Sequence, residues 1–334
     1  MNIGIKNIEY YLPEKILTNN DLEKIYPDWS ADKIYKKTGI MSRHIAGDYE
    51  VVSDLAYNAA VKLFKTVDKD SIDFLLLATQ SPDYILPTTA CILQDRLKLS
   101  IYCGALDFNL GNSAYVYGLA LAKSLVKSKV AKNVLLIMAE IYTKHINKMD
   151  KSTRIIFGDG AAASLICECD ADIGEFVFGT DGSGASNLIV PSGGLKIPRT
   201  SKTKQESIDE NGNVRSADNL FMDGAEIFNF TIDRVPVLVK ETLHKNNIPF
   251  DEINLFIFHQ ANAYILNYLR QKLNIPKNKF YINLKNTGNT VSASIPIAIK
   301  MAEYEGVLKK GDKVMLVGFG VGLSWGAVII NYQG

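Results

Sequence analysis

Apolar runs recur in pairs along this chain, and the members of each pair are alike in layout. Residues 71–81 (SIDFLLLATQS) and 252–262 (EINLFIFHQAN) both have a polar lead, a continuous apolar run and a polar exit that carries glutamine. Residues 132–140 (KNVLLIMAE) are likewise similar to residues 312–320 (DKVMLVGFG). Continuous apolar runs of this length are typical of strands that helices cover on both faces. The pattern therefore predicts four buried strands in two similar pairs.

The two pairs also have almost the same internal spacing, which favours a duplication over chance. Between the strands of each pair lies a helix-like stretch with small residues at its start, residues 113–127 in one half and 291–304 in the other. We therefore predict an α/β fold of two duplicated βαβ-containing halves, residues 1–170 and 171–334, with helices layered between mixed sheets. The stretch 197–219 is rich in Ser, Thr, Lys, Asp and Asn and is predicted to be a surface insertion.

Composition narrows the classes of function. At 334 residues, the chain is long enough for one large α/β unit or for two halves. Its 37 basic and 36 acidic residues are nearly balanced, so nothing indicates a nucleic-acid-binding surface. No apolar run approaches the roughly 18 residues that a membrane span needs. Residues 1–12 alternate like a strand rather than a signal peptide, and we therefore expect a cytoplasmic protein.

The cysteines and histidines do not form a metal-binding pattern. The four cysteines lack CxxC spacing and are expected to be small buried side chains in a reducing cytosol. The four histidines are scattered without HExxH or another ligand spacing, so no metal site is predicted. The lysine-rich residues 123–132 favour a solvated helix face over an anion site. The glycine clusters 179–184 and 193–194 lack the strand-then-helix setting of a phosphate loop, and turns are expected there.

Three features of the second half carry candidate chemistry. His259 ends an apolar strand, where a sheet opens to a crevice, although a lone histidine there is more often structural. The glycine-containing turn 286–290 (NTGNT) precedes a helix of small residues and can aim the side chain of Asn289 into a cavity. The repeated glycines of residues 318–326 (GFGVGLSWG) let backbone amides approach a ligand and could supply an oxyanion hole. Each feature is weak in isolation.

In this order and spacing, the three features resemble the C-terminal half of ketoacyl-ACP synthase III, a condensing enzyme of the thiolase superfamily. The N-terminal half carries further landmarks that are similar to that family: KTGI (37–40) followed by residues 43–45, LPTTA (86–90), FGDGAAA (157–163) and TDGSG (180–184). The resemblance covers essentially the whole chain. It implies a thiolase-like fold, in which an internal duplication is expected, and an acyltransferase of fatty-acid or related biosynthesis.

The reaction that the resemblance implies has two halves. A cysteine at the start of a buried helix takes an acyl group from acyl-CoA, its thiolate favoured by the helix dipole. A malonyl thioester on acyl carrier protein then loses carbon dioxide, and its enolate attacks the acyl-enzyme to give 3-oxoacyl-ACP. Carried over, the donors to the thioester oxygen are His259 and Asn289, and the oxyanion hole for acyl transfer uses the backbone N–H groups of Asn112 and Val321. The CoA and acyl-carrier-protein thioesters are substrates, and the resemblance implies no cofactor.

One residue departs from the family pattern at the nucleophile. The family segment resembles D-x-N-L-G-C-S-G-x-x-Y-G-L, whereas residues 107–119 read DFNLGNSAYVYGL, so Asn112 stands where the catalytic cysteine is expected. An amide is not nucleophilic enough to form an acyl intermediate, and Ser113 would point roughly 100° away on a helix. A plain helix N-cap is the alternative role for Asn112. Whether the residue is engineered or a natural loss, we expect slow decarboxylation of a malonyl thioester without condensation.

The resemblance also implies substrate contacts and a partner. Lys37 and Lys151 align with arginines that often contact CoA phosphates and the acidic carrier protein, although lysine is a poorer bidentate clamp. On base rates, each lysine is a solvated surface charge. Asn262, the last residue of HQAN, is a further substrate-binding candidate. Leu86 matches a position that reaches into the acyl pocket of the partner subunit, which implies a homodimer.

The acyl donor and two alternative functions stay open. Lys33 stands where some members carry a tryptophan, and Tyr264 replaces an arginine, so the sequence leaves both CoA and a carrier protein as candidate acyl donors. A thiolase-fold acyltransferase that acylates an alcohol or amine would keep His259 and often vary the asparagine, so the retained NTGNT turn favours the condensing enzyme. A non-catalytic partner of an active synthase would co-purify as a heterodimer.

Overall fold

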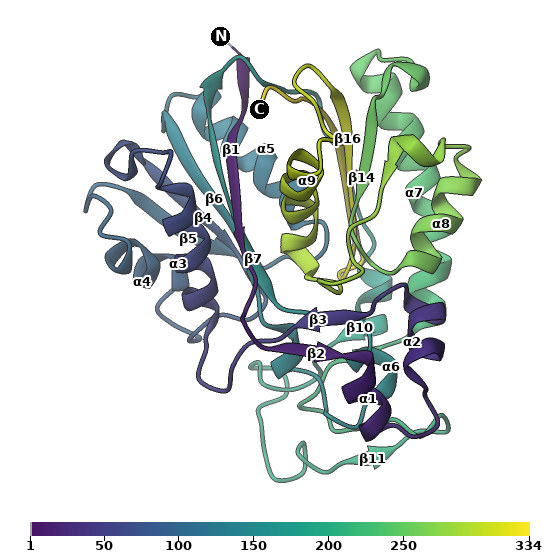
Figure 1. Cartoon of the computed structure of the whole chain (residues 1–334). Helices are drawn as coiled ribbons and strands as arrows, with labels where there is room; N and C mark the ends of the chain where they lie inside the picture. Colours follow the sequence, from purple (N-terminus) through teal and green to yellow (C-terminus); the bar gives the residue numbers. More distant parts are fainter. Residues whose placement is uncertain (1) are drawn as a thin grey trace.

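Two central sheets organise the computed structural model, which describes residues 2–334 (Figure 1). The first sheet has the strand order β1-β7-β6-β4-β5. Its strands are β1 (Asn2–Tyr11), β4 (Phe74–Ala78), β5 (Gly104–Phe108), β6 (Asn133–Glu140) and β7 (Gly160–Cys169). The second sheet has the order β15-β14-β16-β17-β8, with β9 also paired to β17. Its strands are β8 (Asp172–Ile173), β9 (Val177–Thr180), β14 (Leu255–Phe258), β15 (Phe280–Tyr281), β16 (Lys313–Gly320) and β17 (Ser324–Asn331).

Both sheets repeat one pattern of strand directions. Strand β4 is parallel to β5 and β6, while β6 is antiparallel to β7. In the same way, β14 is parallel to β15 and β16, while β16 is antiparallel to β17. The four strands that the apolar runs predict are β4, β6, β14 and β16, and the expected α/β layering of helices with mixed sheets is confirmed. The duplication and its boundary at residue 170 stay predictions.

Helices α5 (Ala114–Lys127) and α9 (Ser294–Tyr304) lie between the two sheets, as Figure 1 shows. A helix that packs on sheets at both sides must be apolar almost all round. Accordingly, Leu119 of α5 and Ile297 of α9 share one buried core with the sheet residues Leu136 and Leu316. This central core holds the start of α5 in a fixed place between the sheets.

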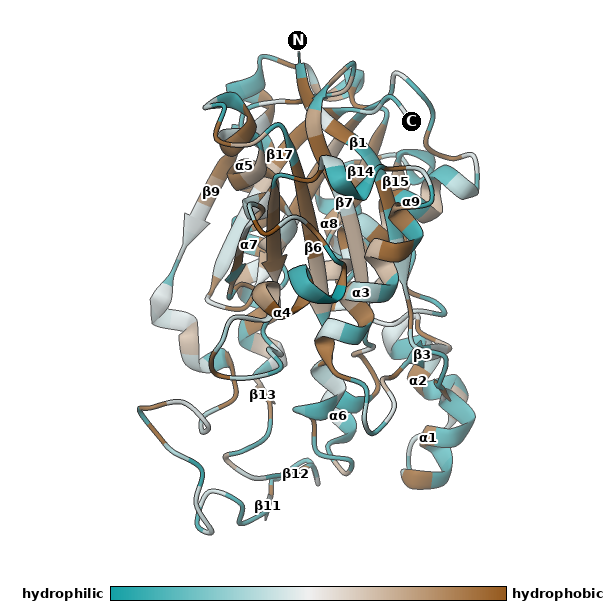
Figure 2. Ribbon diagram, turned by 90° about the vertical axis from the view of Figure 1, so that its left-hand side faces the viewer, coloured by the Kyte–Doolittle hydropathy of each residue, from teal (hydrophilic) through white to brown (hydrophobic). Residues whose placement is uncertain are grey.

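Further helices cover the outer faces of the sheets. On the first sheet, α3 (Val52–Leu63) and α4 (Thr89–Arg96) pack on side chains that alternate with the central ones, so Leu75 and Leu77 point outward while Leu76 points inward. On the second sheet, α7 (Gly224–Asn246) and α8 (Ala263–Lys272) close a third core. Figure 2 shows the strands of both sheets as mainly hydrophobic, in agreement with burial on both faces.

Short elements gather below one end of the sheets (Figures 1 and 2). They are α1 (Asn19–Ile25), α2 (Ala31–Thr38), α6 (Lys151–Arg154), β2 (Ile16–Thr18), β3 (Ser42–His44), β10 (Leu188–Ile189), β11 (Ser207–Ile208), β12 (Val214–Arg215) and β13 (Phe221–Met222). The predicted insertion, residues 197–219, lies largely at the surface here, with β11 and β12 paired as a small hairpin. These elements surround the end of the molecule where β4, β6, β14 and β16 finish.

Three local predictions are wrong in part. Gly179 lies in strand β9 rather than in a turn, where its missing Cβ leaves room for the ring of Trp325. Lys127, Lys129 and Lys132 are exposed as predicted, but Lys123 is only partly exposed, and its ammonium group donates hydrogen bonds to the carbonyls of Ile173 and Gly174. All four cysteines are free, yet Cys91 is exposed, because its position in α4 faces away from the sheet.

Residues 2–334 contain neither a helix suited to span a membrane nor a cluster of metal-ligating side chains. No helix in this range is both long enough and apolar enough to cross a membrane. Within the same residues, no three or more His, Cys, Asp and Glu side chains are grouped so that they could hold a metal ion.

Candidate active site

Three side chains from distant parts of the chain meet where the sheets end. Asn112 precedes α5, His259 follows β14, and Asn289 lies in the turn before α9. Each is buried. The carboxyl ends of parallel strands open a crevice at one edge of a sheet, and the central helices start at that same edge. The topology therefore brings Asn112, His259 and Asn289 together, as their positions in the sequence predict.

The carboxamide of Asn112 joins two halves of the site. Its Nδ2 donates a hydrogen bond to Nε2 of His259 at 2.7 Å. Its Oδ1 accepts a hydrogen bond from the backbone N–H of Val321 at 3.3 Å. Because Val321 can only donate through its backbone N–H, it fixes which end of the amide faces which partner. The amide carbonyl thus lies against a backbone donor.

The alternative role of Asn112 as a helix N-cap is wrong. The N-cap of α5 is Ser113, and no side-chain hydrogen bond caps the helix there. Ser113 is fully buried, and its Oγ is hydrogen-bonded to Oγ of Ser324 at 2.7 Å rather than to His259. Ser113 is therefore in no position to replace a nucleophile at residue 112.

His259 is a neutral imidazole held at both nitrogens. Its Nδ1 lies 2.8 Å from Oγ of Ser294. Its Nε2 faces the amide nitrogens of Asn112 at 2.7 Å and Asn289 at 3.4 Å. Burial lowers the pKa of His259 to about 3, because an imidazolium in this position would lose its hydration. Since both amide groups donate toward Nε2, the proton of the unliganded imidazole is on Nδ1 and points at Ser294.

The turn that carries Asn289 is pinned to the first half of the chain. The backbone N–H of Asn289 donates to the carbonyl of Ile156, and its own carbonyl accepts from Gly158. A Cβ on Gly158 would lie 2.3 Å from the carbonyl oxygen of Thr287, so only glycine allows this approach. Asn289 Oδ1 accepts the N–H of Val291 at 2.9 Å, which leaves Nδ2 facing His259.

Glycines also bring the turn after β16 close to residue 112. A Cβ on Gly320 would lie 2.3 Å from Oδ1 of Asn112, and one on Gly318 would lie 2.7 Å from Cα of Ser113. Backbone therefore packs directly against the start of α5, as the glycine-rich stretch predicts. The N–H of Val321 is the donor that this approach delivers.

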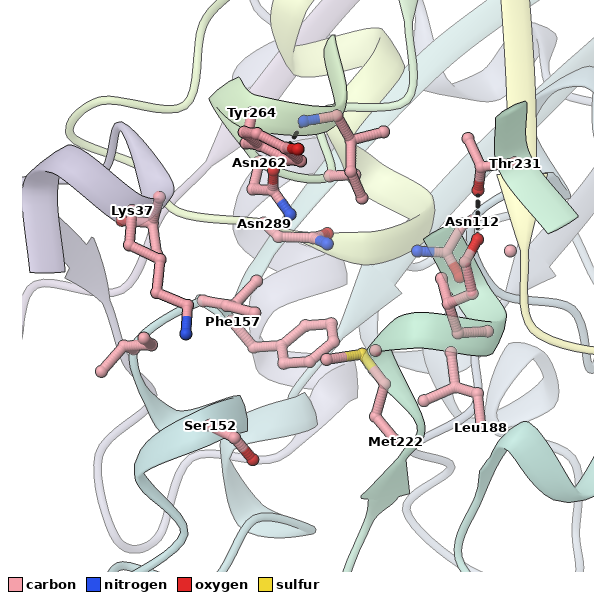
Figure 3. Close-up of a pocket in the computed structure, with 18 of the residues that line it drawn as sticks. Lys37, Asn112, Ser152, Phe157, Leu188, Met222, Thr231, Asn262, Tyr264 and Asn289 are labelled. Carbon is pink, nitrogen blue, oxygen red and sulfur yellow. Dashed lines mark hydrogen bonds between the residues drawn. The ribbon is translucent and has the colours of Figure 1, made fainter. Parts of the chain in front are cut away.

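A cavity of about 490 Å³ is lined by all three side chains, two of which, Asn112 and Asn289, are labelled in Figure 3. Asn112, His259 and Asn289 are buried and mark its inner end, whereas Lys37 is exposed and, with Trp29, also lines the adjoining surface hollow, which marks the mouth. Its walls are mainly apolar and include Phe157, Leu188, Met222 and Ile227. A mainly apolar passage with polar groups at the inner end suits an extended substrate whose reactive group is at its tip.

The predicted substrate-binding residues lie in different places. Lys37 lines the cavity, and its ammonium nitrogen lies 4.7 Å from the ring centroid of Trp29. Asn262 also lines it, although its Oδ1 caps α8 by accepting the N–H of Ile265 at 2.9 Å. Lys151 lies in a second hollow at the mouth rather than in the passage. Leu86 is outside the cavity and largely exposed.

The mouth carries a network of paired charged side chains that the sequence does not reveal. Arg215 of β12 forms ion pairs with the buried Asp150 at 3.0 Å and with Asp209. These bonds hold the β11–β12 hairpin beside Lys151, in the hollow that adjoins the passage. The hairpin thus shapes the entrance, and its own charges are largely paired.

Two groups next to the triad of side chains are also absent from the predicted site. Ser294, the first residue of α9, holds Nδ1 of His259. Glu140, the last residue of β6, is buried behind the site and accepts a hydrogen bond from Ser292. A serine at a helix start gives little sequence signal. An acidic residue that closes an apolar strand is the one hint that points to Glu140.

Comparisons with known proteins point in one direction. A family model described as "3-Oxoacyl-[acyl-carrier-protein (ACP)] synthase III" matches residues 106–182. The model of the same family's C-terminal part matches residues 243–332. The chain is 37% identical to a beta-ketoacyl-[acyl-carrier-protein] synthase III of Fusobacterium nucleatum, with 99% of each chain covered. It is 36% identical to the protein of that name from Caldanaerobacter subterraneus, with 99% and 98% covered.

Solved structures give the same result. The fold matches a crystal structure of 3-oxoacyl-(acyl-carrier-protein) synthase III with a TM-score of 0.98 and 46% identity, over 99% of this chain and 100% of that chain. It also matches the beta-ketoacyl-[acyl carrier protein] synthase III of Thermus thermophilus with a TM-score of 0.87 and 33% identity, over 99% of each chain.

Proposed function

The chain belongs to the 3-oxoacyl-ACP synthase III family, and on that premise we propose that it decarboxylates malonyl-ACP but forms no acyl-enzyme. Membership makes it an acyltransferase-type enzyme of fatty-acid biosynthesis with acyl carrier protein as partner. The observation that carries the proposal is the meeting of Asn112, His259 and Asn289 at the inner end of the passage. Asn112 takes the place of the family's catalytic cysteine.

The position of Asn112 supports this assignment. It stands at the start of a central helix, between a backbone donor at Val321 and the imidazole of His259. A thiolate there would have an oxyanion hole on one side and a base on the other. A carboxamide has no ionisable proton near neutral pH and a delocalised nitrogen lone pair, so it cannot take an acyl group from a thioester.

His259 and Asn289 supply what decarboxylation needs. When the malonyl carboxylate leaves as carbon dioxide, the electron pair of the broken carbon–carbon bond moves onto the thioester oxygen. Two neutral hydrogen-bond donors at that oxygen stabilise the enolate. Asn289 Nδ2 is one donor. The other is Nε2–H of His259, formed when the incoming thioester displaces the Asn112 amide and the ring proton moves from Nδ1. Protonation of the enolate carbon by water then gives the acetyl thioester.

Ser294 allows this change of tautomer. Its hydroxyl lies 2.8 Å from Nδ1 of His259 and accepts the N–H of Gln260 at 3.3 Å. A hydroxyl can accept from Nδ1–H or donate to a bare Nδ1. His259 therefore has a partner at Nδ1 in both tautomers, which keeps the cost of the change low.

The passage and its mouth fit a carrier-bound thioester. A pantetheine arm is thin and partly apolar, and the mainly apolar passage leads its thioester end to His259. We assign phosphate contacts at the mouth to Lys37 and Lys151, and contact with the arm to Asn262. The retained Asn289 favours decarboxylation over acyl transfer to an alcohol or amine, because only an enolate needs the second donor.

The test is mass spectrometry of carrier-protein products. With malonyl-ACP alone, the wild type is expected to give acetyl-ACP, and Asn289→Ala to give much less. With acyl-CoA present, Asn112→Cys is expected to gain a thiol-labile acyl adduct and to form 3-oxoacyl-ACP, while the wild type gains neither. A stoichiometric adduct on the wild type, or unchanged malonyl-ACP after prolonged incubation, contradicts the proposal.

We also assign a homodimer to this chain, with Leu86 of each subunit directed at its partner. Leu86 lies in an exposed apolar stretch with Tyr84 and Ile85, near the end of β5, and the exposed residues Ile101 and Tyr102 precede the start of the same strand. Strand β5, which follows Tyr102, is the edge of the first sheet. An apolar patch beside an unpaired strand edge is a typical association surface.

A further inference from the structure

Glu140 is a buried carboxyl group for which the proposed reaction has no use. It ends β6 behind the active site and is fully buried. No lysine, arginine or histidine of residues 2–334 forms an ion pair with it. Burial raises the pKa of Glu140 to about 8, in keeping with that lack of a positive partner. A carboxyl group kept in such a place needs an explanation from its contacts.

The contacts of Glu140 join three segments that are far apart in the sequence. Its Oε1 accepts a hydrogen bond from Oγ of Ser292 at 2.9 Å. Its Oε2 accepts the backbone N–H of Gln80 at 3.0 Å and faces Oγ of Ser81 at 3.4 Å. The carboxyl group thus ties the exit of β4 and the end of β6 to the short 3-10 turn, Val291–Ala293, that precedes α9.

The Ser292 contact lies one residue from a strained part of the Asn289 turn. Val291 has a φ of +53°, in the left-handed region that β-branched residues rarely adopt. In this conformation its N–H reaches Oδ1 of Asn289 at 2.9 Å, which turns Nδ2 toward His259. A strained backbone of this kind persists only when contacts on both sides hold it. Asn289 is held on one side, and Ser292 is held by Glu140 on the other.

We propose that Glu140 is a positioning residue that, through Ser292, holds the Val291 turn and so directs the Asn289 carboxamide at His259. Glu140 itself does not touch the passage to the active site. Its effect on decarboxylation runs entirely through the direction of the Asn289 donor. The inference rests on the proposed function for its kinetic consequence, but the geometry of Asn289 can be measured without turnover.

Four variants separate the positioning role from a general role in stability. Ser292→Ala removes the one hydroxyl that links Glu140 to the turn. Glu140→Met keeps the approximate size but leaves the hydroxyl of Ser292 and the N–H of Gln80 without their hydrogen-bond partner. Glu140→Gln keeps an oxygen for the Gln80 N–H and offers an NH₂ group that Ser292 Oγ can accept, so it is the conservative rescue. Ser81→Ala is the matched control, because it removes the contact that does not lead to Asn289.

The first measurement is the rate of malonyl-ACP decarboxylation. Ser292→Ala and Glu140→Met are expected to lower kcat about tenfold or more, because a donor displaced by even 1 Å loses much of its effect. KM should stay within about twofold, since the passage is unchanged, and Glu140→Gln and Ser81→Ala should keep kcat within about threefold. Thermal unfolding of every variant shows whether a loss of rate merely follows a loss of fold.

The second measurement needs no activity. In protein with ¹⁵N-labelled asparagine, the side-chain NH₂ signal of Asn289 is assigned through its loss in Asn289→Asp. The signal should move in Ser292→Ala and Glu140→Met and stay in place in Glu140→Gln and Ser81→Ala. An Asn289 signal unmoved in Ser292→Ala overturns the inference, as does unchanged kcat of that variant when the wild type is active. A wild type without decarboxylation defeats the proposed function alone, and the NH₂ signal then decides the positioning role.

Discussion

At the scale of residues, the state of His259 follows from the neutral groups around it. The ring contacts the amides of Asn112 and Asn289, the hydroxyl of Ser294, and the edge of Phe319 with ring centroids 5.6 Å apart. None of these groups carries a charge that would stabilise an imidazolium. A neutral imidazole can stabilise the enolate through one N–H hydrogen bond, without transferring that proton to the enolate oxygen.

The depressed pKa of His259 gives a pH prediction. Its folded pKa of about 3 is below the ordinary 6.5, so the folded state binds fewer protons than the unfolded state between these values. The stability linked to His259 is therefore present above pH 6.5 and is lost as pH falls toward 3. The imidazole ¹⁵N signals of His259, assigned with His259→Asn, should not change between pH 7 and pH 5. A titration centred near pH 6.5 would show that the ring is solvated or paired with an anion.

The raised pKa of Glu140 gives a prediction of the opposite sign. Between the ordinary 4.5 and the folded value of about 8, the folded state binds more protons than the unfolded state, so stability falls as pH rises. Glu140→Gln cannot ionise. In urea unfolding, the variant should gain on the wild type by at most about 1.4 kcal/mol per pH unit across this range. Asp159, whose pKa burial raises to about 6, is present in both proteins. A constant difference from pH 5 to pH 8 would contradict the prediction.

At the scale of elements, the site depends on close contact between the two halves of the chain. The turn of Asn289 lies against the segment before β7, with Gly158 donating to its carbonyl and Phe157 bridged to Asn289. The site is thus assembled at a junction, and a shift of either segment moves Asn289 relative to His259. A substitution that separates the two segments should reduce decarboxylation before it unfolds the protein.

Gly158→Ala tests the junction. The new Cβ would meet the backbone oxygen of Thr287 at 2.3 Å, and backbone cannot move aside as a flexible side chain can. We expect a loss of about 1–3 kcal/mol of unfolding free energy, as for other overpacked sites, together with a drop in kcat. Gly182→Ala is the control, because its Cβ would meet nothing within 4 Å. Equal behaviour of the two variants would mean that the junction is loose.

A helix or strand can be predicted when its pattern lies within one stretch of the sequence. A contact between residues far apart in the sequence leaves no such local pattern and is missed. Strands β4, β6, β14 and β16 are apolar along their whole length, so they are visible without the fold. His259 and Asn289 stand at a strand end and in a glycine turn, which makes them candidates by position. The bond between Glu140 and Ser292 joins residues 152 positions apart, and neither has a local feature that names the other.

At the scale of the whole molecule, the arrangement of layers also explains what could be predicted. The repeat of apolar runs indicates two similar halves, and helices that are apolar all round can only lie between sheets. The mouth of the passage is different, since it is built from short elements and from the β11–β12 hairpin. Their positions depend on single ion pairs such as Arg215 with Asp150, which no periodic pattern reveals.

The last prediction concerns assembly. Ile85 and Tyr102 are 93% and 91% exposed, on the side of the first sheet that ends in the unpaired edge of β5. A stable dimer buries about 1,600 Å² in total, with apolar side chains at its centre, and a lysine there would have to lose its water. We expect the wild type to sediment as a dimer and Ile85→Lys to shift toward monomer. Tyr304→Lys is the control, because Tyr304 is also exposed but belongs to α9, which packs against β1 at the opposite edge. A monomeric wild type would rule out the homodimer. A dimer that persists in Ile85→Lys but dissociates in Tyr304→Lys would place the interface elsewhere. Persistent co-purification with a second synthase would instead favour a non-catalytic partner role.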